Sequence, residues 1–347
     1  MGTRGIPVTI IAGFLGSGKT TLLNHLLGNR AGLRIGVIVN DFGSVNIDGM
    51  AVAGQVDSMR MLDNGCLCCA VDASGLDAML DRLARPGAPI DAIVIEASGL
   101  AEPRAMIRML LASGNPLIEY GGLVEVVDAA EFPATRQRHP ELDTHIGLAD
   151  LVVLNKTDRL TAGELADRHA AVARLAGDAA VLPVSHGSVP TELLFEPAER
   201  PVGTRVGEQL SLADLVADAA ECAADEEHPH LHSMYQTMTY FAPDPLHPRE
   251  FVRFATERPN GLYRMKGFVD FGSPGDRRKY SVQTVGAFLR FERSRWSPGE
   301  QRASQLVLIG AGLDEPAVRE RLDSCRVAVH GAVDDQAMLP VHRYLRG

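Results

Sequence analysis

Short, fully apolar runs alternate along the first half of the chain with longer segments in which apolar residues recur at helical spacing. Such runs, rich in β-branched residues and bounded by glycine or proline, are typical of buried strands. The pattern predicts strands at residues 8–12, 34–40, 90–95, 122–127, 149–154 and 179–184. Because strands that alternate with helices form a mostly parallel sheet with helices on both faces, we expect an α/β fold of this kind.

The pattern changes after residue 184, where a proline-rich stretch predicts a surface connection. A short helix is expected at 211–224, followed by a polar run that ends at His232. Beyond it the sequence predicts strands at 234–241, 262–271, 280–292 and 304–310, and helices at 247–258 and 314–325. We therefore expect one domain at residues 1–205, a linker at 206–233 and a smaller α+β domain at 234–347.

Charge supports this division and narrows the classes of partner. The whole chain carries a net charge of −10, which argues against a nucleic-acid partner. Residues 1–233 carry 17 basic and 31 acidic side chains, whereas residues 234–347 carry 17 and 13. The first strand follows no long apolar run, so neither a signal peptide nor a membrane helix is expected. The five cysteines are few for this length, and we expect a cytoplasmic, reducing location.

The stretch GFLGSGKT matches the phosphate-loop pattern between a predicted strand and a predicted helix. Its glycines allow backbone N–H groups to point at phosphates, and Lys19 is predicted to reach the β- and γ-phosphates. The Thr20 hydroxyl is expected to bind Mg²⁺. The alternative is a glycine-rich turn without a ligand. We expect a P-loop NTPase site whose first nucleotide-binding residues are Gly13, Gly16, Ser17, Gly18, Lys19, Thr20 and Thr21.

The tetrapeptide Asn155-Lys156-Thr157-Asp158 ends a predicted strand downstream of this loop. The Asp158 carboxylate can accept two hydrogen bonds from guanine N1–H and its amine, and adenine lacks that donor pair. Asn155 is expected to hold the loop or the base edge, and the Lys156 stem is expected to lie over the purine. The next strand brings Ser185 to the same edge, where a backbone N–H would meet the guanine oxygen. The pattern favours a guanine nucleotide.

A third predicted strand ends in Glu96, and Gly99 follows it closely. In phosphate-loop enzymes an acid at this place holds the Mg²⁺ shell, and a nearby glycine lets the backbone approach the γ-phosphate. Lys19 and Glu96 are therefore the predicted catalytic residues. The alternative role of Glu96 is to cap the helix that begins near Pro103.

Three cysteines lie within four residues, at Cys66, Cys68 and Cys69, in a chain otherwise poor in cysteine. Three thiolates with one further ligand suit Zn²⁺ or Co²⁺. Buried structural cysteines or a redox pair remain alternatives. A second candidate metal site is the alternating run His228, His230 and His232. The alternative interpretation of this run is a solvated linker without a metal.

Together these motifs resemble the CobW-type metal-chaperone GTPases, relatives of the nickel-delivery GTPases of hydrogenase and urease maturation. The resemblance includes V-N-D-F-G at 39–43, N-G-C-L-C-C at 64–69 and I-V-I-E-A-S-G-L-A-E-P at 93–103. In the C-terminal part, Arg264 to Gly267 match the R-x-K-G strand of that family. Asp41, a candidate metal-binding switch carboxylate, stands where the family often has glutamate.

The resemblance implies a metallochaperone that hydrolyses GTP with Mg²⁺ and delivers Zn²⁺ or Co²⁺ to a client metalloprotein through its C-terminal domain. Hydrolysis is expected to be slow without a partner, because no glutamine or arginine is evident for positioning the attacking water. No nucleic acid or membrane partner is expected. The sequence leaves open whether the protein forms a homodimer. The alternative is a regulatory GTPase whose cysteine site is structural or redox-active. A small-molecule kinase would leave the guanine motif and the cysteines unexplained.

Overall fold

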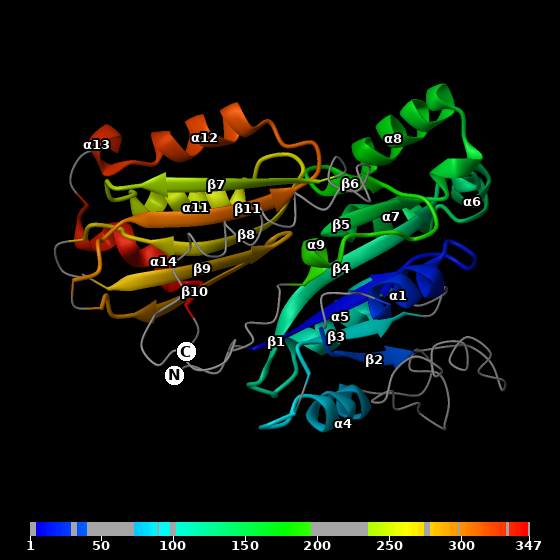
Figure 1. Ribbon diagram of the computed structural model, residues 1–347, viewed down its shortest axis with the longest axis horizontal. Coiled ribbons are helices and arrows are strands. Elements are labelled where there is room, and N and C mark those ends of the chain that lie inside the picture. The colour runs from blue at the N-terminus through cyan, green and yellow to red at the C-terminus, as the bar shows by residue number, and fades with distance from the viewer. Residues whose placement is uncertain are drawn as a thin grey trace. The chain divides into compact units, whose positions relative to one another are not determined.

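The protein is described from a computed structural model, which covers residues 5–28, 33–39, 73–88, 90–97, 102–195, 235–273, 278–297, 299–330 and 333–345. The chain divides into two compact units, Met1–Ala198 and Glu199–Gly347 (Figure 1). The predicted helix at 211–224 and the predicted linker bounds lie outside the described residues, so they stay predictions. None of the described helices is both long and apolar enough to span a membrane.

The first unit alternates strands and helices, as its apolar pattern predicts. Its strands are β1 Ile6–Ala12, β2 Ile35–Val39, β3 Ala92–Glu96, β4 Ile118–Asp128, β5 Leu151–Asn155 and β6 Ala180–Pro183. Its described helices are α1 Lys19–Leu27, α4 Ala73–Leu83, α5 Pro103–Leu111, α6 Phe132–Arg138, α7 Glu141–Leu148, α8 Ala162–Ala176 and α9 Thr191–Leu194, with a 3₁₀ turn at Thr157–Arg159.

The six strands form one sheet in the order β2-β3-β1-β4-β5-β6, and every neighbouring pair is parallel. This confirms the predicted α/β class. In a parallel sheet the carboxyl ends of all strands meet at one edge. The order places β1 between β3 and β4, so the phosphate loop after β1 lies next to the ends of both strands.

Strands β3 and β5 are buried along their whole length, because helices cover both faces of this sheet. On one face, Val152 and Leu154 of β5 pack in a cluster with Leu142 and Ile146 of α7 and Val172 of α8. Helix α8 begins with a capping box, in which the Thr161 hydroxyl accepts from the Glu164 N–H and the Glu164 carboxylate accepts from the Thr161 N–H.

The second unit is a five-stranded antiparallel sheet in the order β10-β9-β8-β11-β7 with helices packed on it. Its strands are β7 Gln236–Ala242, β8 Leu262–Val269, β9 Lys279–Val285, β10 Phe288–Ser294 and β11 Ser304–Gly310. Its helices are α11 Pro248–Thr256, α12 Glu315–Ser324, α13 Val327–His330 and α14 Leu339–His342, with a 3₁₀ turn at Asp335–Met338.

The sequence prediction of a single strand at 280–292 is wrong. The segment is a hairpin, β9 and β10, that turns at Gly286 and Ala287. Gly286 has φ of 54°, a left-handed conformation that glycine adopts without steric cost. The error arises because the turn carries no polar residue to interrupt the apolar pattern.

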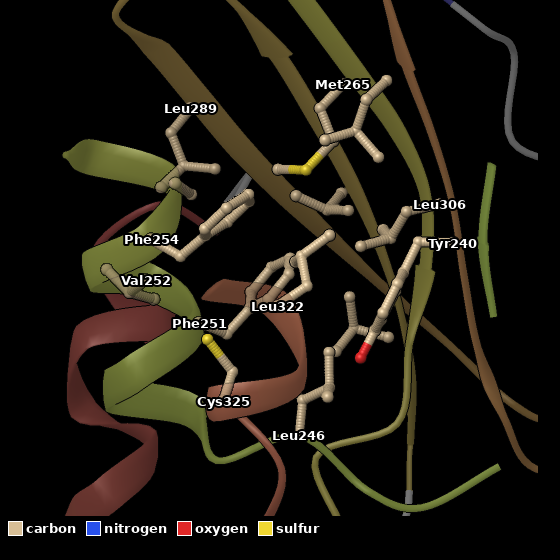
Figure 2. Packing of buried hydrophobic residues seen from close by; sticks show 14 of the residues in the cluster. Tyr240, Leu246, Phe251, Val252, Phe254, Met265, Leu289, Leu306, Leu322 and Cys325 are labelled. Carbon is tan, nitrogen blue, oxygen red and sulfur yellow. The ribbon is translucent and has the colours of Figure 1, made fainter. Parts of the chain in front are cut away.

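An aromatic-rich core joins the helices of the second unit to one face of its sheet (Figure 2). Phe251 and Phe254 of α11 point toward Leu289, Met265 and Leu306 of the sheet, as Figure 2 shows. Strands β8 and β11 approach closely at Gly267, where an added Cβ would overlap the carbonyl oxygen of Gln305. The glycine of the R-x-K-G motif therefore has a packing role in this sheet.

Candidate nucleotide-binding site

The phosphate loop connects β1 to α1, and close contacts leave no room for a side chain at two of its glycines, Gly13 and Gly18. Gly13 has φ of 141°, and a Cβ there would overlap the carbonyl oxygen of Val126 in β4. Gly18 has φ of 104°, and a Cβ there would overlap the side-chain amide of Asn155. Helix α1 begins at Lys19, directly after the loop, so the N–H groups of its first turn lie at the loop's end. A helix N-terminus after a glycine-rich loop is typical of anion-binding sites, and phosphate binding here stays a prediction.

Lys19 is buried beneath the loop that precedes it. Its Nζ donates to the carbonyl oxygens of Gly13 at 2.8 Å and Phe14 at 3.2 Å. The Ser17 hydroxyl is also buried and has no hydrogen-bond partner among the described residues. Both groups are hydrogen-bond donors at the loop, and both are predicted to donate to phosphate oxygens.

Thr20 and Glu96 meet although they are far apart in sequence. The Thr20 hydroxyl donates to Glu96 Oε1 at 3.0 Å, and Glu96 is buried at the end of β3. A hydroxyl and a carboxylate are oxygen ligands of the kind that Mg²⁺ prefers, so these residues fit the predicted magnesium site. When bound, Mg²⁺ would neutralise charge on the phosphates.

Asn155 joins the guanine motif to the phosphate loop. Its Nδ2 donates to the Ser17 carbonyl oxygen at 2.9 Å, and its Oδ1 accepts from the Gly187 N–H at 2.9 Å. Of the two roles expected for Asn155, it holds the loop. The sequence analysis missed Gly187, whose added Cβ would come within 2.7 Å of the Leu22 backbone nitrogen. The signal that could have revealed it is the glycine two residues after Ser185, at the end of β6.

Lys156 is fixed by two contacts and a left-handed backbone with φ of 62°. Its Nζ donates to the Gly16 carbonyl oxygen at 2.6 Å and pairs with Asp128 Oδ2 at 2.7 Å. Asp128, which ends β4, was also missed by the sequence analysis, although a carboxylate at a strand end is a recognisable signal. These contacts stretch the Lys156 stem across the end of the loop.

Asp158 and Ser185 complete this edge of the sheet. Asp158 is exposed in the 3₁₀ turn after Lys156, so its carboxylate is accessible to a ligand. The Ser185 hydroxyl lies 2.9 Å from the Thr157 hydroxyl, and Thr157 N–H donates to the Val184 carbonyl oxygen. The structure therefore brings Ser185 beside the guanine motif.

Glu125 is a further acidic residue at the site that the sequence analysis did not identify. It lies in β4 with its side chain fully buried, and burial raises its pKa to about 8 while the charge of Lys19 acts in the opposite direction. The available signal was a single glutamate within the apolar run Leu123-Val124-Glu125-Val126-Val127.

Asp41, Gly99 and both predicted metal clusters lie outside the described residues. One cluster is Cys66, Cys68 and Cys69, and the other is His228, His230 and His232. Within the described part of the chain, no group of three or more His, Cys, Asp or Glu side chains is arranged to hold a metal ion. The predicted metal-binding residues therefore stay predictions.

Two family models match the chain, one in each unit. Residues 7–183 match the nucleotide-binding domain of CobW/HypB/UreG, and residues 235–326 match the C-terminal domain of the cobalamin synthesis protein CobW. A zinc chaperone CobW from a Sinorhizobium species is 32% identical over 90% of this chain and 95% of its own length. A zinc chaperone CobW from Pseudomonas aeruginosa is 32% identical over 91% of this chain and 90% of its own length.

Among solved structures, the Zn(II)-bound YjiA GTPase from Escherichia coli matches with a TM-score of 0.43 and 24% identity, covering 93% of this chain and 99% of that one. The sequence relationships are the stronger finding, since they extend over both units. The chain therefore belongs to the CobW branch of the CobW/HypB/UreG nucleotide-binding family.

Proposed function

We propose that this protein is a GTP-hydrolysing metallochaperone that binds Zn²⁺ or Co²⁺ at its C-x-C-C motif and delivers it to a client protein. The observation that carries the nucleotide part is the double contact of Asn155, which ties the guanine motif to the phosphate loop. The metal part is supported by the full-length relatives, which are named zinc chaperones.

In this proposal guanine is selected by Asp158. Its exposed carboxylate accepts from N1–H and the exocyclic amine of the base, while the Lys156 stem, anchored on Gly16 and Asp128, covers the ring. Ser185 contributes its backbone N–H to the guanine oxygen. ATP would meet the same phosphate loop but would lack the donor pair for Asp158.

Hydrolysis then depends on charge placed around the phosphates. Lys19 neutralises the β- and γ-phosphates, and Thr20 and Glu96 hold Mg²⁺. The sequence offers no evident glutamine or arginine for positioning the attacking water, so in this proposal turnover is slow until a partner binds.

Metal affinity is coupled to the nucleotide state because the C-x-C-C motif follows β2 in the chain, where GTPases place a switch region. Such coupling is reciprocal, since each ligand biases the other by the same free energy. A hundredfold change in metal affinity requires about 2.7 kcal/mol, which lies within the usual range of coupling free energies. GTP hydrolysis would then release the metal to the client, which the C-terminal unit recognises.

The test is a competition titration of Zn²⁺ and Co²⁺ against a chromophoric chelator, on reduced protein with Mg²⁺ and either GDP or a non-hydrolysable GTP analogue. We expect a large affinity difference between the two states that disappears in Cys66→Ser and Cys68→Ser. Cys325→Ala is the control, because this buried thiol has its pKa raised to about 11 by burial and is poorly suited to bind metal.

Equal metal affinity in the two nucleotide states of the unmodified protein would contradict the delivery mechanism. That result would favour the alternative, a regulatory GTPase whose cysteines are structural or redox-active. Retention of metal through many rounds of GTP hydrolysis would favour the same alternative.

A further inference from the structure

Glu125 is a buried carboxylic acid that the nucleotide-binding roles above do not use. It lies in the apolar half of β4 with 0% of its surface exposed. Neither carboxylate oxygen has a hydrogen-bond partner among the described residues. An ionised carboxylate is strongly disfavoured in such a place unless it is paired. This environment therefore favours the neutral acid.

The position of Glu125 connects it to the phosphate loop. In the sheet it pairs with Ala12, the residue before Gly13, and the carbonyl oxygen of the next residue, Val126, packs directly against Gly13. The Gly13 carbonyl oxygen in turn accepts a hydrogen bond from the Lys19 ammonium at 2.8 Å. Lys19 is also the residue whose charge acts on the Glu125 carboxyl group. Glu125 therefore lies next to the strand position that supports the loop.

Alternation along the strands places Glu125 on the face of the sheet that α7 covers, because its partner Val152 packs there. Its neighbours in β1 and β5, Ala12 and Val152, carry no charge. β4 and the described elements packed most closely against it carry other titratable groups. They are Glu119 and Asp128 of β4, Arg104 and Arg108 of α5, and Glu141, Asp143 and His145 of α7. Asp150, just before β5, accepts a hydrogen bond from the Tyr120 hydroxyl.

We propose that Glu125 is a proton-binding residue of the nucleotide site, which carries its proton while phosphates fill the loop and opposes their binding when it ionises. The inference rests on the nucleotide-binding part of the proposed function and is independent of the metal part. An ionised Glu125 would compete with phosphate oxygens for the charge of Lys19 and would repel their negative charge.

The sign of the pH dependence follows from proton linkage. Burial raises the pKa of Glu125 to about 8 against the pull of Lys19, and phosphates in the loop raise that pKa further. The nucleotide complex therefore holds more protons near pH 8 than the free protein does. Affinity is highest below this pH and falls as the pH rises through it, by roughly tenfold for each unit by which the nucleotide raises the pKa.

The experiment is calorimetric titration of the full chain with GDP and Mg²⁺, without transition metal, at pH 8 in buffers that differ in ionisation enthalpy. The dependence of the apparent enthalpy on the buffer gives the number of protons taken up. We expect fractional uptake by the unmodified protein and less uptake by Glu125→Gln, which is neutral at every pH. Guanine titrates at alkaline pH in both proteins, so the difference between them is the readout.

Glu119→Gln is the matched control, since it removes a carboxylate from the beginning of the same strand, away from the loop. It is expected to take up protons as the unmodified protein does. Equal uptake by the unmodified protein and Glu125→Gln would overturn the inference. Absence of uptake in the unmodified protein would overturn it even if Glu125→Gln fails to fold. Absence of GDP binding at any pH would instead overturn the proposed function.

Discussion

At the scale of single residues, the Asn155 side chain joins the phosphate loop to the segment that follows β6. Asn155 is 1% exposed, and Asn155→Ala leaves the Ser17 carbonyl and the Gly187 N–H without this partner. Each unsatisfied group costs about 1–3 kcal/mol. We expect GDP affinity to fall at least about tenfold, since about 1.4 kcal/mol corresponds to that factor. Fluorescence titration with a labelled GDP measures the change.

Asn115→Ala provides the control for this prediction. The Asn115 side chain likewise donates hydrogen bonds, to Asp81 at 2.7 Å and to the Ala84 carbonyl oxygen at 3.3 Å, and accepts one from the Leu117 N–H at 2.8 Å. It lies between α5 and β4, away from the loop. Its loss is expected to lower stability without changing the affinity for GDP. A similar loss of affinity in both variants would show that Asn155 acts through general stability.

Most of the site residues that the sequence predicted belong to motifs with a fixed local spacing, whereas Glu96 and Ser185 were predicted because each lies at or just after the end of a predicted strand. Gly13 to Thr20 run from the end of β1 into the first turn of α1, and Asn155 to Asp158 run from the last residue of β5 into the 3₁₀ turn that follows it. Asp128, Gly187 and Glu125 could not be assigned in this way, because their contacts depend on which strands become neighbours. The pairing of Asp128 with Lys156, for example, exists only because β4 and β5 are adjacent.

At the scale of elements, the close approach of β8 and β11 makes a specific prediction about Gly267. Gly267→Ala would push a methyl group into the Gln305 carbonyl, so the two strands must separate locally. Overpacking of this kind costs about 1–3 kcal/mol. The single tryptophan of the chain, Trp296, lies in the second unit, so its fluorescence during urea unfolding reports this change directly.

Gly312→Ala separates the steric cost from the cost of the backbone conformation. Gly312 has φ of 71°, but no atom lies within 4 Å of an added Cβ. We expect Gly267→Ala to lower the urea midpoint more than Gly312→Ala. An equal or smaller effect of Gly267→Ala would mean that the strands accommodate the methyl group.

The elements themselves were largely predictable, because buried parallel strands are continuous apolar runs separated by helical spacing. The hairpin of β9 and β10 was not, since the apolar pattern continues through its turn and Gly286 is the only signal. The order of the strands in the sheet could not be predicted from the sequence either. The position of β1 between β3 and β4 depends on long-range pairing that no local pattern encodes.

At the scale of the whole molecule, the change in charge along the chain indicated two parts, and the structure has two compact units. The bounds expected for the segment between them remain predictions, since residues 196–234 lie outside the described part. Each unit has a core of its own, formed by different residues. Two cores in one chain are expected to give an unfolding transition that is not two-state.

A ligand that binds one unit should therefore raise the stability of that unit alone. GDP with Mg²⁺ at 100 times its dissociation constant contributes about 2.7 kcal/mol by mass action, which corresponds to a shift of roughly 5–10 °C for a unit of this size. Scanning calorimetry is expected to show this shift in one transition, while the melting of Trp296 fluorescence stays unchanged. ADP at the same concentration should shift neither transition. Movement of the Trp296 transition with GDP would contradict independent unfolding and would show that nucleotide binding is coupled to the C-terminal unit.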